Sequence, residues 1–117
     1  MDIQPIYQNN LGIAFRWKSP AVNDITKIQI VFRDTGLLID KAELKQFLRN
    51  IRYTKESGTL CADCINHASC KVLLVQSPSP KITFAMNVEE LKALTNLVER
   101  TLFYLSLEDL IQHALGD

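Results

Sequence analysis

Three cysteines and one histidine recur at every third position in the middle of the chain. Cys61, Cys64, His67 and Cys70 form the pattern C-x2-C-x2-H-x2-C. Thiolate sulfur and imidazole nitrogen are ligands that suit zinc or an iron–sulfur cluster. The four residues are therefore candidate metal ligands, and zinc is the candidate cofactor.

The spacing of these four residues fits one shared metal ion poorly. Structural zinc sites usually divide their ligands into two pairs on separate elements, so that four atoms converge tetrahedrally. Here only two residues separate one pair from the next. On an α-helix each three-residue step turns the side chain by about 300°, so Cys61 and Cys70 would point to opposite sides. A wrapped loop could present three of the four ligands.

A thiol-redox role and plain structural packing are also open for this loop. Cys61 and Cys64 form a C-x-x-C motif, which can cycle between dithiol and disulfide, most readily at a helix N-terminus. The strand before and the long helix after such a motif in thioredoxin-like proteins are not evident here. Small cysteines also pack as apolar side chains in or under a loop. The odd number of cysteines excludes a complete disulfide framework within one chain.

A basic stripe is the second feature with potential chemistry. Lys41, Lys45, Arg49 and Arg52 follow one another at i, i+4, i+8 and i+11 on a predicted helix. Such a stripe could bind phosphate groups. An ordinary solvated helix face accounts for the same spacing, and acidic residues of the second long helix are candidate partners for it.

The charge of the chain is balanced as a whole but not along its length. Thirteen Lys and Arg residues match thirteen Asp and Glu residues, which argues against a dedicated nucleic-acid binder. Residues 1–58 contain nine basic and six acidic residues (+3), and residues 59–117 contain four and seven (−3). The halves could attract each other within one chain or across a homodimer.

Neither a targeting segment nor a membrane span is predicted. The first residues lack the basic and apolar regions of a secretory signal. The longest apolar runs, 37–39 and 72–75, are far too short to cross a bilayer. We therefore expect a cytoplasmic protein with reduced thiols.

The ranges 3–18, 27–39 and 71–86 contain the alternation of apolar and polar residues, or the short apolar runs, that are typical of β-strands. A turn signal interrupts each range, so each is predicted to form a hairpin. In the first hairpin the side chains expected to face the core are Ile13, Phe15 and Trp17. In the second, the turn is placed at Asp34-Thr35-Gly36, with the glycine supplying the positive φ that tight turns need.

A helix is predicted after the second hairpin and another after the third. Asp40 and Asn87 are N-caps, and Glu43 and Glu90 stand three residues later, which is the spacing of a capping box. The caps lie 47 residues apart, and three further pairs match at this offset: Leu44 with Leu91, Lys45 with Lys92 and Ile51 with Val98. The correspondence predicts two similar strand–turn–strand–helix units.

The chain is predicted to be a single domain, 1–117, in four parts: unit one at about 25–53, the cysteine loop at 58–70, unit two at about 71–105 and a short terminal helix at 106–115. Ser106 is the predicted cap of that last helix. Because the helix is short and strongly apolar, it must bury one face on the domain or on a partner chain.

The predicted fold is α+β, with an antiparallel sheet of five to seven strands and two long helices on one face. The predicted core residues of the sheet are Phe15, Trp17, Ile28, Ile30, Phe32, Val72, Leu74, Ile82 and Phe84. Those of the helices are Leu44, Phe47, Leu91, Leu94 and Val98.

The segment Ile39-Asp40-Lys41-Ala42-Glu43-Leu44-Lys45-Gln46-Phe47-Leu48, after its hairpin, resembles small uncharacterised bacterial domains of unknown function. The similarity covers about residues 27–52 and again 81–98. It implies a hairpin followed by a capped helix and no activity. The function predicted from the sequence is a non-enzymatic binding or regulatory module that acts as a homodimer. The alternative is a metal-binding or thiol-redox protein that uses the cysteine loop. The sequence identifies no small-molecule ligand.

Overall fold

The computed structural model describes residues 2–18, 26–57 and 73–115. Along these residues the elements follow in the order β1 (Ile3–Gln8), β2 (Gly12–Trp17), β3 (Lys27–Phe32), β4 (Thr35–Asp40), α1 (Lys41–Ser57), β5 (Leu73–Gln76), β6 (Thr83–Met86) and α3 (Val88–Leu115). The fold is α+β, as the sequence predicted.

The strands form two sheets, so the expected single sheet of five to seven strands is wrong. An antiparallel sheet has the order β1-β2-β3-β4, and β5 and β6 pair separately as an antiparallel ribbon. Side chains from other elements bond the outer carbonyl groups of the ribbon. Asn50 and Thr54 of α1 donate to the carbonyl oxygens of Gln76 and Leu74 on β5.

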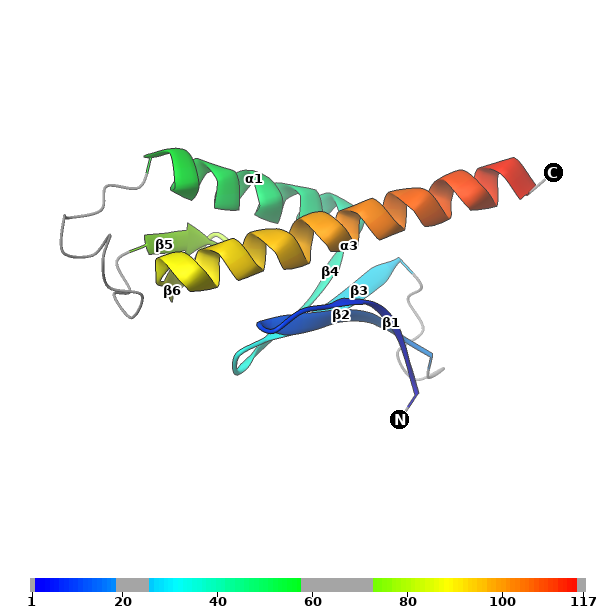
Figure 1. Cartoon of the computed structure of the whole chain (residues 1–117), viewed down its shortest axis with the longest axis horizontal. Coiled ribbons are helices and arrows are strands. Elements are labelled where there is room, and N and C mark those ends of the chain that lie inside the picture. The colour runs from blue at the N-terminus through cyan, green and yellow to red at the C-terminus, as the bar shows by residue number, and fades with distance from the viewer. Residues whose placement is uncertain (1, 19–25, 58–72, 116–117) are drawn as a thin grey trace.

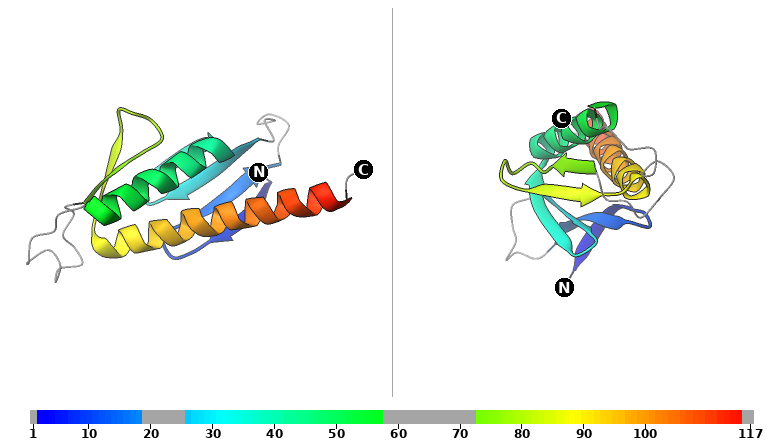
Figure 2. Two further views of the ribbon diagram at one scale, coloured as in Figure 1. Left: turned by 90° about the horizontal axis from the view of Figure 1, so that it is seen from above. Right: turned by 90° about the vertical axis from the view of Figure 1, so that its left-hand side faces the viewer.

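The core lies where the two helices cover both sheets. Helices α1 and α3 run side by side, with the β5–β6 ribbon beneath one end and the four-stranded sheet below (Figures 1 and 2). The rings of Phe32, Phe47 and Phe84, from β3, α1 and β6, lie with centroids 5.1 to 6.5 Å apart. The other predicted core residues that the structure confirms are Ile28, Ile30, Leu44, Leu91, Leu94 and Val98.

Strand β2 faces the opposite way from the sequence prediction. Ala14 pairs with the inward-facing Ile30 and is completely buried. Phe15 and Trp17 pack edge to face on the other side of the sheet, 5.0 Å apart. Their aromatic character suggested the core face, but Ala14 takes that face instead. Phe15 is nevertheless buried, at 7% exposure, although it lies outside the main core cluster.

The buried face of β5 and the exposure of Ile82 also differ from the prediction. Leu73 and Val75 are buried, whereas Leu74 is 62% exposed and Ile82 is 49% exposed. The run 72–75 is apolar throughout, so it contains no alternation from which the buried face could be chosen. Val72 lies outside the described residues.

The turn between β3 and β4 consists of Arg33 and Asp34, and Gly36 lies within β4. The residue with positive φ is Arg33, at 53°, and not Gly36. The unusual backbone of Arg33 coincides with an anchored side chain. Its Nη1 donates to the carbonyl oxygen of Ala85 at 3.0 Å and lies 3.6 Å from the Glu90 carboxylate.

Both capping boxes are present, but the separate terminal helix is absent. The N–H of Glu43 donates to Asp40, and the N–H of Glu90 donates to Asn87. Helix α3 then continues through Ser106 to Leu115. No glycine or proline interrupts residues 88–115, so a serine with capping chemistry does not stop the helix.

Candidate functional site

The C-terminal end of α3 projects beyond the rest of the molecule. In Figure 1 it is the orange and red end of the helix, and Figure 2 shows from above that it extends past α1 and the strands. The molecule is correspondingly elongated, with extents of 55 × 30 × 26 Å. A helix end that leaves the body presents side chains to solvent around most of its circumference.

This projecting end carries exposed apolar side chains, most of them on the side away from the body. We define the apolar stripe as Phe103, Leu107, Leu110, Ile111, Ala114 and Leu115, all of which are exposed. Leu110 is 66% exposed and Leu115 is 82% exposed. With the adjacent Tyr104, these side chains expose roughly 600 Å², the upper end of the range that monomeric proteins leave uncovered.

Two ion pairs hold the same end of α3 to the body. Arg16 of β2 donates to both carboxylate oxygens of Glu108, at 2.5 and 2.8 Å. Lys41 of α1 donates to Asp109 at 2.6 Å. The hydrogen bond from Lys41, together with the charge of its ammonium group, lowers the pKa of Asp109 below its ordinary value. Both acids of the segment are thus turned toward the body, and the apolar stripe carries no charge.

A groove of about 670 Å³ lies between this helix end and the sheet. Its walls are lined by Gln4, Arg16, Glu108, Asp109, Ile111, Gln112 and Leu115. The groove therefore combines two residues of the apolar stripe with the paired charges beneath it. Both carboxylate oxygens of Glu108 accept hydrogen bonds from Arg16, so the charge of the guanidinium is already neutralised.

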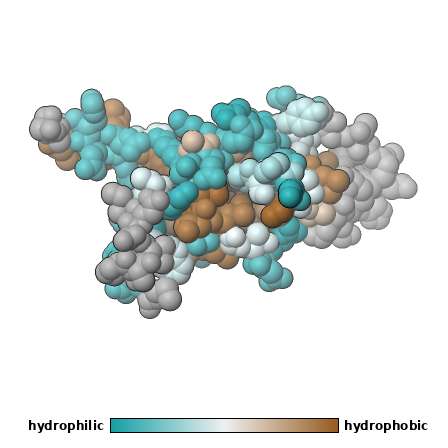
Figure 3. All heavy atoms as spheres, turned by 180° about the vertical axis from the view of Figure 1, so that it is seen from behind, coloured by the Kyte–Doolittle hydropathy of each residue, from teal (hydrophilic) through white to brown (hydrophobic). Residues whose placement is uncertain are grey.

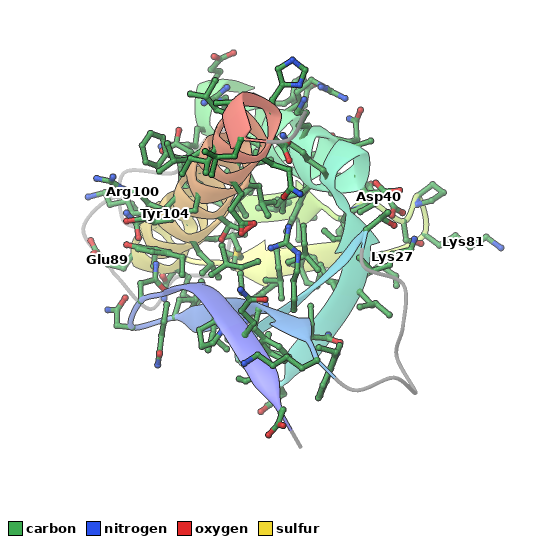
Figure 4. All side chains as sticks on the ribbon, turned by 90° about the vertical axis from the view of Figure 1, so that its right-hand side faces the viewer. Lys27, Asp40, Lys81, Glu89, Arg100 and Tyr104 are labelled. Atoms are coloured by element: carbon green, nitrogen blue, oxygen red, sulfur yellow. The ribbon has the colours of Figure 1, made fainter. Side chains whose placement is uncertain are left out.

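Hairpin β1–β2 supports the base of the projecting segment. Tyr7 donates from its hydroxyl to Asn96 at 2.8 Å, and its ring stacks on Tyr104 at 6.1 Å. Asn9 donates to the carbonyl oxygen of Ala93. Figure 4 shows Arg100 and Tyr104 on the side of α3 that lies over this hairpin. These contacts fix the direction in which the helix leaves the body.

The four predicted metal ligands Cys61, Cys64, His67 and Cys70 lie outside the described residues. The zinc site therefore stays a prediction. Within 2–18, 26–57 and 73–115 no group of three or more His, Cys, Asp or Glu side chains could hold a metal ion.

The predicted basic surface on α1 is partly engaged by α3. Lys41 pairs with Asp109, and Arg52 pairs with Glu99 at 3.1 Å. Arg49 donates to Gln46 on its own helix. Of the acidic residues Glu89, Glu90 and Glu99 that were its candidate partners, only Glu99 pairs with the basic stripe in the described part of the chain, whereas Glu89 pairs with Lys92 and Glu90 with Arg33.

Neither helix of the described ranges has a stretch long and apolar enough to span a bilayer. No protein-family model matches the chain, and neither the curated proteins nor the solved structures include a match to it. The resemblance to small bacterial domains therefore stays a prediction, and the function must be argued from the apolar stripe itself.

Proposed function

We propose that the protein is a non-enzymatic binding module that acts as a homodimer, joined through the apolar stripe of α3. The observation that carries this proposal is the exposure of the stripe on a helix end that projects from the body. An uncharged apolar surface at the upper end of what monomers expose is often a functional contact surface.

A second copy is the partner that the charges favour. Glu108 and Asp109 are neutralised within the chain by Arg16 and Lys41. Two identical stripes can consequently meet without bringing like charges together. A partner chosen by charge complementarity would find no charge on the stripe to complement.

The spacing of the stripe suits a pair of helices. Phe103, Leu107, Leu110 and Ala114 are separated by four, three and four residues, which is the repeat of interlocking helices. In an antiparallel pair the large Phe103 would lie opposite the small Ala114 of the partner subunit. Leu107 would lie opposite Leu110 of the partner subunit. Large side chains would then meet small ones at the two ends of the contact.

The size of the contact sets the expected affinity. Covering all of this surface on both copies would bury at most about 1,200 Å² in total, at the lower limit of stable protein interfaces. We therefore expect a dimer that dissociates in the micromolar range and not a permanent one. Its mass should rise with concentration from the 13.3 kDa of one chain toward twice that value.

Leu110→Glu tests the proposal. Leu110 is 66% exposed, so the glutamate should leave the fold of the single chain intact. It places two carboxylates in an apolar contact, and the dimer should weaken by at least about tenfold, which corresponds to 1.4 kcal/mol. Multi-angle light scattering from micromolar to submillimolar protein measures the mass.

Leu74→Glu is the matched control, because Leu74 is 62% exposed on β5, far from the projecting end (Figure 1). It should dimerise like the wild-type chain. A wild-type protein that stays at 13.3 kDa throughout, or two variants with equal effects, would contradict the proposal.

The metal-binding or thiol-redox function is the second candidate, and C-x2-C-x2-H-x2-C is the observation that favours it. Metal analysis of protein purified without chelators, with a thiol count under air, distinguishes it from structural packing. Absence of metal together with three unreactive thiols would remove this candidate.

A further inference from the structure

The sheet edges of the molecule are protected unequally. Edge strand β1 contains Pro5, which has no N–H to offer, and its pairing with β2 shifts register between Pro5 and Tyr7. Prolines and bulges are the devices that keep an edge strand from pairing with other chains. Edge strand β4 has neither device, and all six of its residues pair with β3 in unbroken register.

The ribbon edges are protected by side chains. Asn50 Nδ2 donates to the Gln76 carbonyl oxygen at 3.0 Å, and Thr54 Oγ1 donates to that of Leu74 at 3.1 Å. On the other edge of the ribbon, Arg33 donates to the carbonyl oxygen of Ala85. A strand of another protein would therefore find these carbonyl oxygens of β5 and β6 already hydrogen-bonded.

The hairpin geometry shows which groups of β4 face outward. A two-residue turn joins Phe32 to Thr35, so this closing pair exchanges both backbone hydrogen bonds and the pattern alternates from there. Gly36, Leu38 and Asp40 then direct their N–H and C=O groups away from β3. The N–H of Asp40 follows this pattern, because it donates to Glu43 Oε1 at 3.0 Å.

Two residues of β4 thus keep their outward backbone groups available. Among the described residues no hydrogen bond reaches the outward N–H or C=O of Gly36 or Leu38. Both residues are exposed, and the side chain of Leu38 is 45% exposed. From Thr35 to Ile39 the strand has no charged residue. Figure 3 shows hydrophobic residues gathered near the middle of the face turned away from the viewer of Figure 1.

We infer that the free edge of β4 accepts an extended, uncharged segment of another protein as an added strand of the sheet. The outward groups of Gly36 and Leu38 supply the backbone hydrogen bonds, and the uncharged residues from Thr35 to Ile39 favour a partner segment without charges. This site does not depend on the proposed dimer, since β4 and the projecting end of α3 are separate surfaces (Figure 1).

A second copy of β4 is disfavoured as the occupant. Symmetric antiparallel pairing centred on Leu37 would place Asp34 opposite Asp40 of the partner subunit, and like charges directly opposite are unfavourable. Pairing centred on Leu38 would require the N–H of Asp40, which Glu43 already accepts. A segment of different sequence meets neither obstacle.

A capped, fluorescently labelled peptide of alternating valine and threonine is the probe. Its binding to the wild-type protein is measured by fluorescence anisotropy. Hydrogen exchange should show that the N–H groups of Gly36 or Leu38 become protected when the probe is added. A probe that does not bind at millimolar protein, or that binds without protecting these groups, overturns the inference.

Leu38→Pro removes one outward N–H and leaves the bonds of β4 to β3 in place, because Leu38 and Gln29 form a non-bonded pair. The probe should bind about tenfold more weakly to this variant. Leu38→Val keeps the N–H and should bind like the wild type. A probe N-methylated at alternate residues tests the same bonds on the unaltered protein, and equal binding of both probes overturns the inference.

Discussion

Phe32→Ala is expected to lower the free energy of unfolding by about 3–5 kcal/mol. Phe32 is completely buried, and its ring contacts those of Phe47 and Phe84. These three rings join β3 of the larger sheet, α1 and β6 of the ribbon. Removing the central ring leaves a cavity that each of the three elements borders. The loss is a large part of the roughly 5–15 kcal/mol that stabilises a typical domain.

Urea denaturation followed by circular dichroism measures this effect. Leu74→Ala is the control, because it shortens an apolar side chain that is 62% exposed. It should change the free energy of unfolding by less than about 1 kcal/mol. If Phe32→Ala lost no more stability than Leu74→Ala, the aromatic cluster would not be the centre of the core.

The features predicted correctly from the sequence are those encoded by neighbouring residues. Asp40 with Glu43 and Asn87 with Glu90 form their reciprocal hydrogen bonds three residues apart. Such bonds depend on the local chain alone. The inward side of β3 was equally clear, because Ile28, Ile30 and Phe32 lie two residues apart and only Val31 departs from the alternation.

The features predicted wrongly depend on how distant elements pack. Ser106 has the chemistry of an N-cap, yet α3 passes through it, and the next turn is held by Arg16 and Lys41 from elsewhere in the chain. The sequence indicated that this segment is apolar and needs a partner surface. The absence of glycine and proline from 88–115 allowed the segment to continue α3, but nothing in the sequence indicated that it would project beyond the body.

The candidate site follows from that same distant packing. In the sequence, Glu108 and Asp109 interrupt the apolar segment. Only their pairing with Arg16 and Lys41 shows that both acids are directed toward the body and leave the stripe without charge. The free edge of β4 likewise depends on sheet order, which the sequence left at five to seven strands in one sheet.

The inversion of β2 has a testable consequence at Gly12, whose lack of a side chain lets β2 and β3 approach closely. A Cβ added at Gly12 would overlap the Val31 carbonyl oxygen and lie 2.8 Å from the Cβ of Phe32. These are backbone atoms and the root of a side chain, which cannot rotate away. Gly12→Ala should therefore cost about 3 kcal/mol of unfolding free energy by forcing the two strands apart.

Gly36→Ala is the matched control for this prediction. A Cβ at Gly36 would lie 3.1 Å from Nε2 of Gln29, the flexible end of a side chain that can move. Its cost should stay below about 1 kcal/mol, since alanine in a strand also removes the conformational freedom of glycine from the unfolded chain. Urea denaturation of both variants gives the comparison. Equal stability of the two would mean that β2 and β3 lie farther apart at Gly12, and that the small residues Gly12 and Ala14 do not set the spacing of the core face.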